Sequence, residues 1–375
     1  MKPPIYLDYQ ATTPLAPEAA GAMRPWLDFG FANPHSSHRM GREAAAAVEV
    51  ARERVIAALG GEGGSLYFTS GATEAINWAL KGAAAHLPAG RRRIVTLATE
   101  HAAVLDTVEW LGTQRFDVDI LPVFLDGLAM QETLAGATAA PTGIVAAMLV
   151  NNEIGVIQPV AEIAALARSR GALFLCDAVQ GFGRVPLPLE SCDMVALSAH
   201  KIHGPKGIGA LWVRDGIDLD PLLHGGGQEG GLRSGTLSPA LCAGFGEAAR
   251  LIEERREEDH AHVERLWRIA FDLLPGWTLN GSAEARYKGN LSLCRAGIDA
   301  GRLISEIREV AFSAGSACAS GSGRSSHVLA ALKLSDREAR STIRLGFGRY
   351  TTEDEIAEAA SLINAAANRQ LNFAQ

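Results

Sequence analysis

Of the six lysines, Lys201 comes just after a short apolar run at residues 194–197, and Lys206 lies in the segment that follows it. A run of this kind predicts a buried strand, and an ammonium group at its end is unusual because ammonium is strongly hydrated. A lysine in such a place can have a lowered pKa and form a Schiff base with an aldehyde. The other four lysines lie at the N-terminus or at positions typical of surface helices and turns. Lys201 and Lys206 are therefore the candidates for covalent chemistry.

Two further groups follow predicted strands. The run at 173–176 is followed by Asp177, whose carboxylate is costly to bury unless a cation, such as the protonated nitrogen of a ligand ring, pairs with it. The run at 66–69 is followed by a turn of small residues and a helical pattern, where backbone amides and the Thr73 hydroxyl could bind an anion. The structural alternatives are a helix cap for Thr73 and a turn residue for Asp177.

The carboxyl ends of parallel strands meet at one edge of a sheet, so these groups are expected to share one site. A lysine, an acid and an anion cradle match the aldehyde, the ring nitrogen and the phosphate of pyridoxal 5′-phosphate, which is the cofactor that these residues predict. His101 opens another helical stretch at the same edge. Its imidazole is suited to stacking on a ring or moving a proton.

The five cysteines have irregular spacing and form no CxxC pair, which argues against a disulfide framework and a zinc site; the ten histidines show no metal-binding pattern either. Cys318 differs from the others because it lies in a stretch of small residues at 312–324, where a thiol should be accessible and Arg324 could lower its pKa. A thiol in a tolerant loop is the alternative, and Cys192 is left unassigned. Three cysteines are expected to be small buried fillers: Cys176, Cys242 and Cys294.

The elements that must hold these groups alternate between strands and helices from about residue 65 to residue 213. Helical patterns at 72–85, 102–114 and 160–170 separate several of the apolar runs. This alternation predicts an α/β fold with a mostly parallel sheet covered on both faces. The expected strands are 66–69, 94–97, 118–122, 144–150, 173–176, 194–197 and 208–213.

The pattern changes after Gly244. A charged helix at about 247–274 is followed by shorter strands at 290–294 and 342–345 and by helices at 301–308 and 352–368. These segments predict a second, smaller α+β domain, with the long helix as the connector. We expect a large cofactor-binding domain over 14–250, and a small domain formed by 1–13 and 251–375 that carries the cysteine loop 313–325.

The composition limits the class of protein. With 375 residues, 47% hydrophobic and 21% charged, the chain is typical of folded globular proteins rather than disordered ones. A net charge of −7 argues against nucleic acid as a direct partner. The longest apolar run, 143–150, is too short to span a membrane, and the N-terminus lacks the apolar core of a signal peptide. We therefore expect a cytoplasmic protein without a membrane partner.

Taken as a whole, the sequence resembles the cysteine desulfurases, which are pyridoxal-phosphate enzymes of the class V aminotransferase family with fold type I. The motifs occur in the family's order over nearly the whole chain, and the long cysteine loop is similar to that of the NifS/IscS-like group rather than the SufS-like group. The matching segments are YLDYQATTP (6–14), SGATEAIN (70–77), EHAAVLDT (100–107), NNEIGV (151–156), DAVQ (177–180), SAHKIHGPKGIGALWV (198–213), GGGQEGGLRSGT (225–236), SAGSACASGS (313–322) and IRLGFGRYTTEDEI (343–356).

The resemblance implies a role for each matching position. Lys201 would bind the cofactor covalently, Asp177 would stabilise the ring nitrogen, and His101 would stack on the ring and move protons. Gln180 and Asn152 would contact the phenolic oxygen or the substrate side of the ring.

The resemblance also implies how phosphate and substrate are held. Arg344, with Asn152, would bind the substrate carboxylate, as guanidinium geometry suits. Cys318 would be the nucleophile. The implied phosphate contacts are Ala72, Thr73, Ser198, His200 and, from a second subunit, Thr236.

The implied reaction transfers the sulfur of L-cysteine to Cys318 and releases L-alanine. The persulfide would pass to a protein acceptor for iron–sulfur cluster assembly or another thiolation, and the enzyme would be a homodimer. The sequence departs from the family at 323–325, where Gly-Arg-Ser replaces the usual Leu-Glu-Pro. The alternatives are a selenocysteine lyase, another lyase or aminotransferase of this fold, and a non-catalytic sulfur-relay protein.

Overall fold

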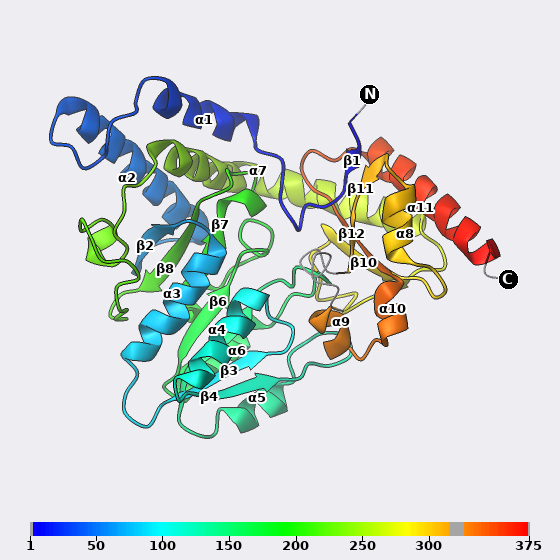
Figure 1. Ribbon diagram of the computed structural model, residues 1–375, viewed down its shortest axis with the longest axis horizontal. Helices are drawn as coiled ribbons and strands as arrows, with labels where there is room; N and C mark the ends of the chain where they lie inside the picture. Colours follow the sequence, from blue (N-terminus) through cyan, green and yellow to red (C-terminus); the bar gives the residue numbers. More distant parts are fainter. Residues whose placement is uncertain (1–2, 316–325, 374–375) are drawn as a thin grey trace.

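The computed structural model describes residues 3–315 and 326–373. Its largest sheet has seven strands in the order β2-β8-β7-β6-β5-β3-β4 (Figure 1). The strand β8 runs antiparallel to both of its neighbours, and the other pairs are parallel, so the expected mixed, mostly parallel sheet is confirmed. The strands are β2 (Gly64–Thr69), β3 (Arg93–Leu97), β4 (Asp117–Leu121), β5 (Thr142–Met148), β6 (Leu173–Asp177), β7 (Met194–Ser198) and β8 (Gly209–Arg214).

Helices cover both faces of this sheet, as the apolar runs predict. Successive residues of a central strand point to opposite faces, so Ile144 packs in one core cluster and Val145 in the other. The helices α3 (Ala72–Ala85) and α4 (Ala102–Thr113) pack against the first face. The helices α2 (Arg39–Leu59) and α6 (Val160–Ser169) pack against the second. The shorter α5 (Gln131–Ala137) lies beside β4.

The long helix α7 (Pro239–Asp272) begins well before the expected position of about 247. The Ser238 side chain accepts a hydrogen bond from the Leu241 amide, and Pro239 occupies the first turn, where a missing N–H costs nothing. The first half of α7 packs against α1 (Pro17–Asp28) and α2. Its later residues Leu266 and Ala270 belong to the second core cluster, so one helix contributes to both cores.

The second core surrounds a four-stranded sheet in the order β12-β13-β10-β9. Ile5 and Leu7 pack in this core, beside the C-terminal elements, whereas α9 (His327–Ala331) packs in the first core. The limits of the two domains therefore stay a prediction. The elements after α7 are β9 (Thr278–Leu279), β10 (Asn290–Cys294), α8 (Ala300–Glu306), β11 (Val310–Ala311), β12 (Ser313–Ala314), α9, α10 (Asp336–Arg340), β13 (Thr342–Gly346) and α11 (Glu353–Phe373); β1 (Ile5–Tyr6) pairs with β11.

The N-terminal segment 8–13 runs from the second core to the edge of the large sheet. Its Gln10 side chain donates to the Gly289 carbonyl oxygen at 2.8 Å, and the Thr13 amide donates to the His200 carbonyl oxygen at 2.9 Å. A Cβ atom on Gly346 would lie 1.7 Å from the Gln10 side-chain oxygen, so this crossing requires a glycine there. In the part of the chain that the structure describes, no helix is both long and apolar enough to cross a bilayer.

A buried ion pair ties the glycine-rich loop at 225–231 to β2. The Glu229 carboxylate accepts from the Arg52 guanidinium at 2.7 Å and from the Phe68 amide at 2.6 Å. The Glu229 side chain is 2% exposed, whereas Glu49, which also pairs with Arg52, is 60% exposed. Glu229 and Glu49 therefore pair with the same guanidinium and differ in burial, so Glu49 can serve as the control for Glu229.

We expect Glu229→Gln to lower the free energy of unfolding by about 3–5 kcal/mol, because it removes the buried partner of Arg52 and leaves that guanidinium only the exposed Glu49 as a charged partner. Glu49→Gln should cost about 0–1 kcal/mol, since exposed pairs contribute little. Urea denaturation of both variants measures the difference. Equal losses in the two variants would contradict the assignment of Glu229 as the anchor of the loop.

Candidate active site

The carboxyl ends of β5, β6 and β7 open into a cavity of about 600 Å³, a size typical of small-molecule sites. The start of α3, the segment 10–12 and β13 complete its wall. The cavity brings together ten of the residues singled out from the sequence: Ala72, Thr73, His101, Asn152, Asp177, Gln180, Ser198, His200, Lys201 and Arg344.

Lys201 ends a single 3₁₀ turn, Ala199–Lys201, directly after β7. Its Nζ donates to the carbonyl oxygens of Gln10 at 2.5 Å and Ala11 at 2.8 Å. Lys206 also lines the cavity, but its side chain is exposed. The half-buried and oriented amine is therefore that of Lys201, in agreement with the choice that the sequence motif favours.

Asp177 is the last residue of β6 and is buried. Its carboxylate accepts a hydrogen bond from the Val179 amide at 3.0 Å. Burial raises the pKa of Asp177, and the nearby His101 and Lys201 oppose that shift. A carboxylate in this position is stabilised by a cation in the cavity, such as a protonated ring nitrogen.

His101 caps α4, so the expected start of that helix is confirmed. Its Nδ1 accepts a hydrogen bond from the Ala103 amide at 3.0 Å, which assigns the proton of the neutral ring to Nε2. Burial lowers the pKa of His101, although the charge of Asp177 opposes the shift. The ring is therefore a neutral donor through Nε2 near neutral pH.

The anion side of the cavity is built from β7 and the start of α3. The helix begins at Ala72 with Gly71 as its N-cap, so the alternative of Thr73 as the cap is wrong, and Thr73 lies in the first turn. A Cβ on Gly209 would lie 2.7 Å from the Gly71 Cα, so glycine at this position of β8 lets the turn approach the strand.

His200 contributes to this side as a neutral group. Its Nδ1 lies 3.1 Å from the Thr12 hydroxyl oxygen. Burial lowers the pKa of His200 to about 4, and the charges of Lys201, Lys206 and Arg184 add to the shift. Positive charge near an anion would therefore come from the lysines and the helix start, while His200 and Ser198 offer neutral donors.

Arg344, on β13, is 1% exposed and reaches the cavity from the second core. Its Nη2 donates to the Asp8 carboxylate at 2.8 Å, and its Nη1 donates to the Asn152 carbonyl oxygen at 3.0 Å. Its Nε is buried without a hydrogen-bond partner among the described residues. That donor fits a ligand carboxylate, because a buried N–H without a partner is costly.

Asp8, Gln10 and Ala11 are the site residues that sequence reasoning missed. They lie in the motif at 6–14, but their partners Arg344 and Lys201 are far away in the sequence, so no local pattern reveals the contacts. Their proximity depends on the crossing of the segment 8–13 between the two cores.

Two sequence-predicted residues are not placed in this cavity. Thr236 is exposed and is not part of the cavity lining. Cys318, with Arg324 and most of the loop 313–325, lies outside the described residues. The chain before this stretch pairs with β13, where Ser313 is opposite Arg344, and the chain after it is held by a hydrogen bond from Ser326 to Glu153.

The four described cysteines are buried free thiols. The assignment of Cys176, Cys242 and Cys294 as buried fillers is thus confirmed, and Cys192 joins them. Burial raises the pKa of Cys242 to about 12, so its thiol is a poor nucleophile at neutral pH. Among the described residues, no three His, Cys, Asp or Glu side chains come together as a metal site.

The donor set fits pyridoxal 5′-phosphate. A buried carboxylate suits the ring nitrogen, a half-buried lysine suits the aldehyde, and the start of α3 with Ser198 suits the phosphate. These groups come from three separate elements of the fold and face one cavity of sufficient size.

Glu100 lies beside this site and is completely buried. Its Oε1 accepts from the Met148 amide at 2.9 Å, and its Oε2 is buried with no partner among the described residues. Burial raises the pKa of Glu100 well above 4.5, and the negative charge of Asp177 adds to the shift. The fold therefore favours the protonated, neutral form of the Glu100 carboxyl group.

Comparison with known proteins gives a consistent result. The family model of the class-V aminotransferases matches residues 5–358. The chain is 44% identical over 369 residues to "Cysteine desulfurase IscS" of Rickettsia akari, covering 96% of this chain and 90% of that protein. It is 44% identical over 375 residues to the same enzyme of Rickettsia bellii, covering 98% and 92%.

Solved structures are similar over the same length. A NifS-like protein aligns with a TM-score of 0.90 at 33% identity, covering 98% of this chain and 100% of that chain. The structure "SspA in complex with cysteine" aligns with a TM-score of 0.82 at 34% identity, covering 93% and 100%. Both likenesses extend over the two cores that surround the cavity.

We predict that Glu100→Gln stabilises the protein, and that the gain grows as the pH rises above the unfolded pKa of 4.5. Because the folded state holds the Glu100 proton above that pKa, the wild type loses stability as the pH rises further. Glutamine is neutral in both states and can still accept from the Met148 amide. Denaturant titrations at several pH values test this, and a stability difference that is constant with pH would contradict it.

Proposed function

The chain belongs to the class V aminotransferase family and is a cysteine desulfurase, and from that premise we propose that L-cysteine, Lys201 and Cys318 meet in the cavity described above. The observation that carries the proposal is the joint placement of the Lys201 amine and the Asp177 carboxylate in one cavity at the end of the sheet. The family depends on pyridoxal phosphate, so these two groups have a defined purpose.

The cofactor, when bound, supplies an aldehyde for the substrate amine and a ring that draws electrons away from the substrate Cα. Lys201 would hold the aldehyde end and Asp177 the protonated ring nitrogen. Thr73, Ser198 and His200 would hold the phosphate, with the amide of Ala72 at the helix start.

The substrate carboxylate would bind to Arg344 through the unpartnered Nε. Asp8 and the Asn152 carbonyl hold the other two nitrogens of that guanidinium, so its plane is fixed before the substrate arrives. The His101 ring would stack on the cofactor, donate a hydrogen bond through its Nε2–H and move protons at that nitrogen, since Nδ1 is engaged with the Ala103 amide. Gln180 and Asn152 would contact the phenolic oxygen or the substrate side of the ring.

Cys318 would accept the sulfur. Its thiolate attacks the substrate sulfur, an S–S bond forms, and the C–S bond breaks. The electron pair of the C–S bond remains on the substrate carbon, which takes up a proton, so that L-cysteine and a thiol become L-alanine and a persulfide. The persulfide would then pass to a protein acceptor, for iron–sulfur cluster assembly or another thiolation.

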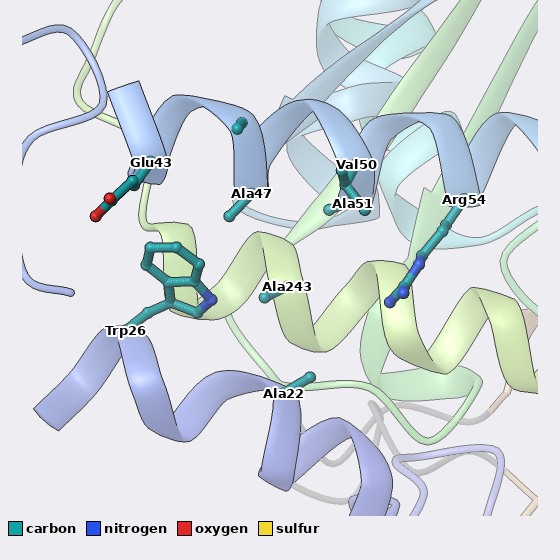
Figure 2. A pocket seen from close by; sticks show the side chains of 9 residues that line it. Ala22, Trp26, Glu43, Ala47, Val50, Ala51, Arg54 and Ala243 are labelled. Atoms are coloured by element: carbon teal, nitrogen blue, oxygen red, sulfur yellow. The ribbon is translucent and has the colours of Figure 1, made fainter. Parts of the chain in front are cut away.

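We also propose that the enzyme acts as a homodimer. Leu27 in the last turn of α1 is 65% exposed, and Phe29 and Phe31 just after the helix are 80% and 77% exposed. Exposed apolar clusters of this kind are typical of interfaces. Figure 2 shows a mostly apolar groove between α1, α2 and α7, in which the Trp26 ring of α1 lies between Ala47 of α2 and Ala243 of α7. In this arrangement Thr236, which does not line its own cavity, would serve the cavity of the second subunit.

The proposed location is the cytoplasm. The four described cysteines are free thiols, which are the form that a reducing compartment maintains. A persulfide carrier also depends on thiols that are not consumed by oxidation.

We expect Cys318→Ala to keep the visible absorbance of the bound cofactor and to lose release of sulfide from L-cysteine by at least about 100-fold, because no thiolate remains to take the sulfur. The control is Cys294→Ala, a buried cysteine of β10, which should release sulfide at nearly the wild-type rate. Alanine and sulfide are measured with and without a reductant. Unchanged activity of Cys318→Ala would overturn the role of Cys318, and transfer of the L-cysteine amino group to a 2-oxo acid without loss of sulfur would favour a transaminase.

Lys201→Ala should lose the visible absorbance that depends on the bond between lysine and cofactor, whereas Lys206→Ala should keep it. The physical reason is that the Lys201 amine is oriented by the Gln10 and Ala11 carbonyls and the Lys206 side chain is exposed. Borohydride reduction followed by peptide mass spectrometry identifies the attached lysine. A cofactor that is fixed to Lys206 in the wild type would refute the assignment.

A further inference from the structure

Arg184 lies just behind the cavity, in the turn that follows β6 and Gln180. Its guanidinium donates to the Gln180 side-chain oxygen and, at 2.6 Å, to the Lys201 carbonyl oxygen. It also lies over the Tyr287 ring, 5.3 Å from the ring centre. Within the described residues no carboxylate forms an ion pair with it, so its positive charge is not neutralised locally.

The contacts of Arg184 belong to a closed circuit of hydrogen bonds. The Gln180 Nε2 donates to the Gln10 carbonyl oxygen at 2.9 Å. The Lys201 Nζ donates to the same oxygen at 2.5 Å. Arg184 therefore holds Gln180 from one side and the backbone of Lys201 from the other, and the two side chains meet again at one acceptor.

A guanidinium is suited to this position because its donors lie in a rigid planar fork that can reach two acceptors at once. An ammonium carries the same charge but offers a single nitrogen. The bond to Arg184 also fixes the orientation of the Gln180 amide, because an acceptor for a guanidinium must be the oxygen rather than the nitrogen.

The Arg184 guanidinium is linked to the lysine amine through the Gln180 side chain and the Gln10 carbonyl oxygen. Like charges close together disfavour protonation, so a cation behind Lys201 favours the neutral nitrogen that can react with an aldehyde. Asp177 acts in the opposite direction, and among the described residues the neutral His101 and His200 and the exposed Lys206 also face this amine.

We propose that Arg184 is a positioning residue of this enzyme, which sets the orientation of Gln180 and the position of Lys201 and keeps a positive charge behind the reactive amine. The inference rests on the proposed function in that Gln180 and Lys201 face the cofactor. The competing explanation is a purely structural contact between the turn after β6 and the turn after β7.

The test compares Arg184→Gln and Arg184→Lys with the control Arg91→Gln. Like Arg184, Arg91 donates to backbone carbonyl oxygens, those of Thr142, Arg170 and Gly171, but it lies at the opposite ends of the strands. The measurements are the dissociation constant of pyridoxal phosphate by equilibrium dialysis and the pH midpoint of the visible absorbance of the reconstituted protein. Thermal unfolding of each variant records any general loss of stability.

We expect Arg184→Gln to weaken cofactor binding by about tenfold and to raise the pH midpoint by about one unit, because a cation near the titrating nitrogen is lost. Arg184→Lys should weaken cofactor binding but leave the midpoint near that of the wild type, since the charge stays and the fork is lost. Arg91→Gln should change neither quantity, whatever its effect on unfolding.

The proposal is overturned if Arg184→Gln leaves the midpoint unchanged, or if Arg91→Gln shifts it equally. Should Arg184→Gln fail to fold, Arg184→Lys decides: weaker cofactor binding with an unchanged midpoint supports the proposal, and unchanged binding overturns it. A wild-type protein that forms no visible band with pyridoxal phosphate would instead refute the proposed function, so the two failures are distinguishable.

Discussion

Two carbonyl oxygens of the N-terminal segment, those of Gln10 and Ala11, accept hydrogen bonds from the Lys201 ammonium group just after the buried strand β7. An amine in this place needs acceptors, because leaving the water is costly for an ammonium group. Two residues earlier in the same segment, Asp8 pairs with Arg344 of the second core. The crossing of six residues, 8–13, therefore holds the amine and the guanidinium on two sides of one cavity, and the rest of the site is built around it.

The charges of the site follow from burial. Asp177 and Glu100 are both buried carboxyl groups whose pKa is raised. The charge of Lys201 opposes the shift at Asp177, whereas the charge of Asp177 adds to the shift at Glu100 and favours its neutral form. His101 and His200 are kept neutral because burial lowers the pKa of each. The result is a cavity in which the lysines and Arg344 provide positive charge, with Arg184 behind them, and the imidazoles are neutral, that of His101 with its proton on Nε2.

Much of the large sheet is readable from the sequence because its strands are nearly continuous apolar runs between turn residues. The helix Ala72–Ala85 is recovered with its exact bounds, whereas the start of α7 is placed too late although Ser238 and Pro239 form a standard capping signal. The helices α1 and α2 are not predicted from the sequence, because neither has a strong stripe of large apolar residues and α2 is rich in alanine. Long-range contacts such as those of Asp8 and Arg184 depend on the tertiary fold, so local patterns do not reveal them.

The central claim is that one thiol of this chain receives the sulfur that L-cysteine loses. It is tested most directly by a single turnover of the holoenzyme with L-cysteine in the absence of reductant, followed by peptide mass spectrometry and an alanine assay. The account predicts one added sulfur atom on the peptide that contains Cys318, in equal amount to the alanine formed. Alanine formed with the added sulfur on another cysteine, or with no sulfur retained on the protein, would contradict it.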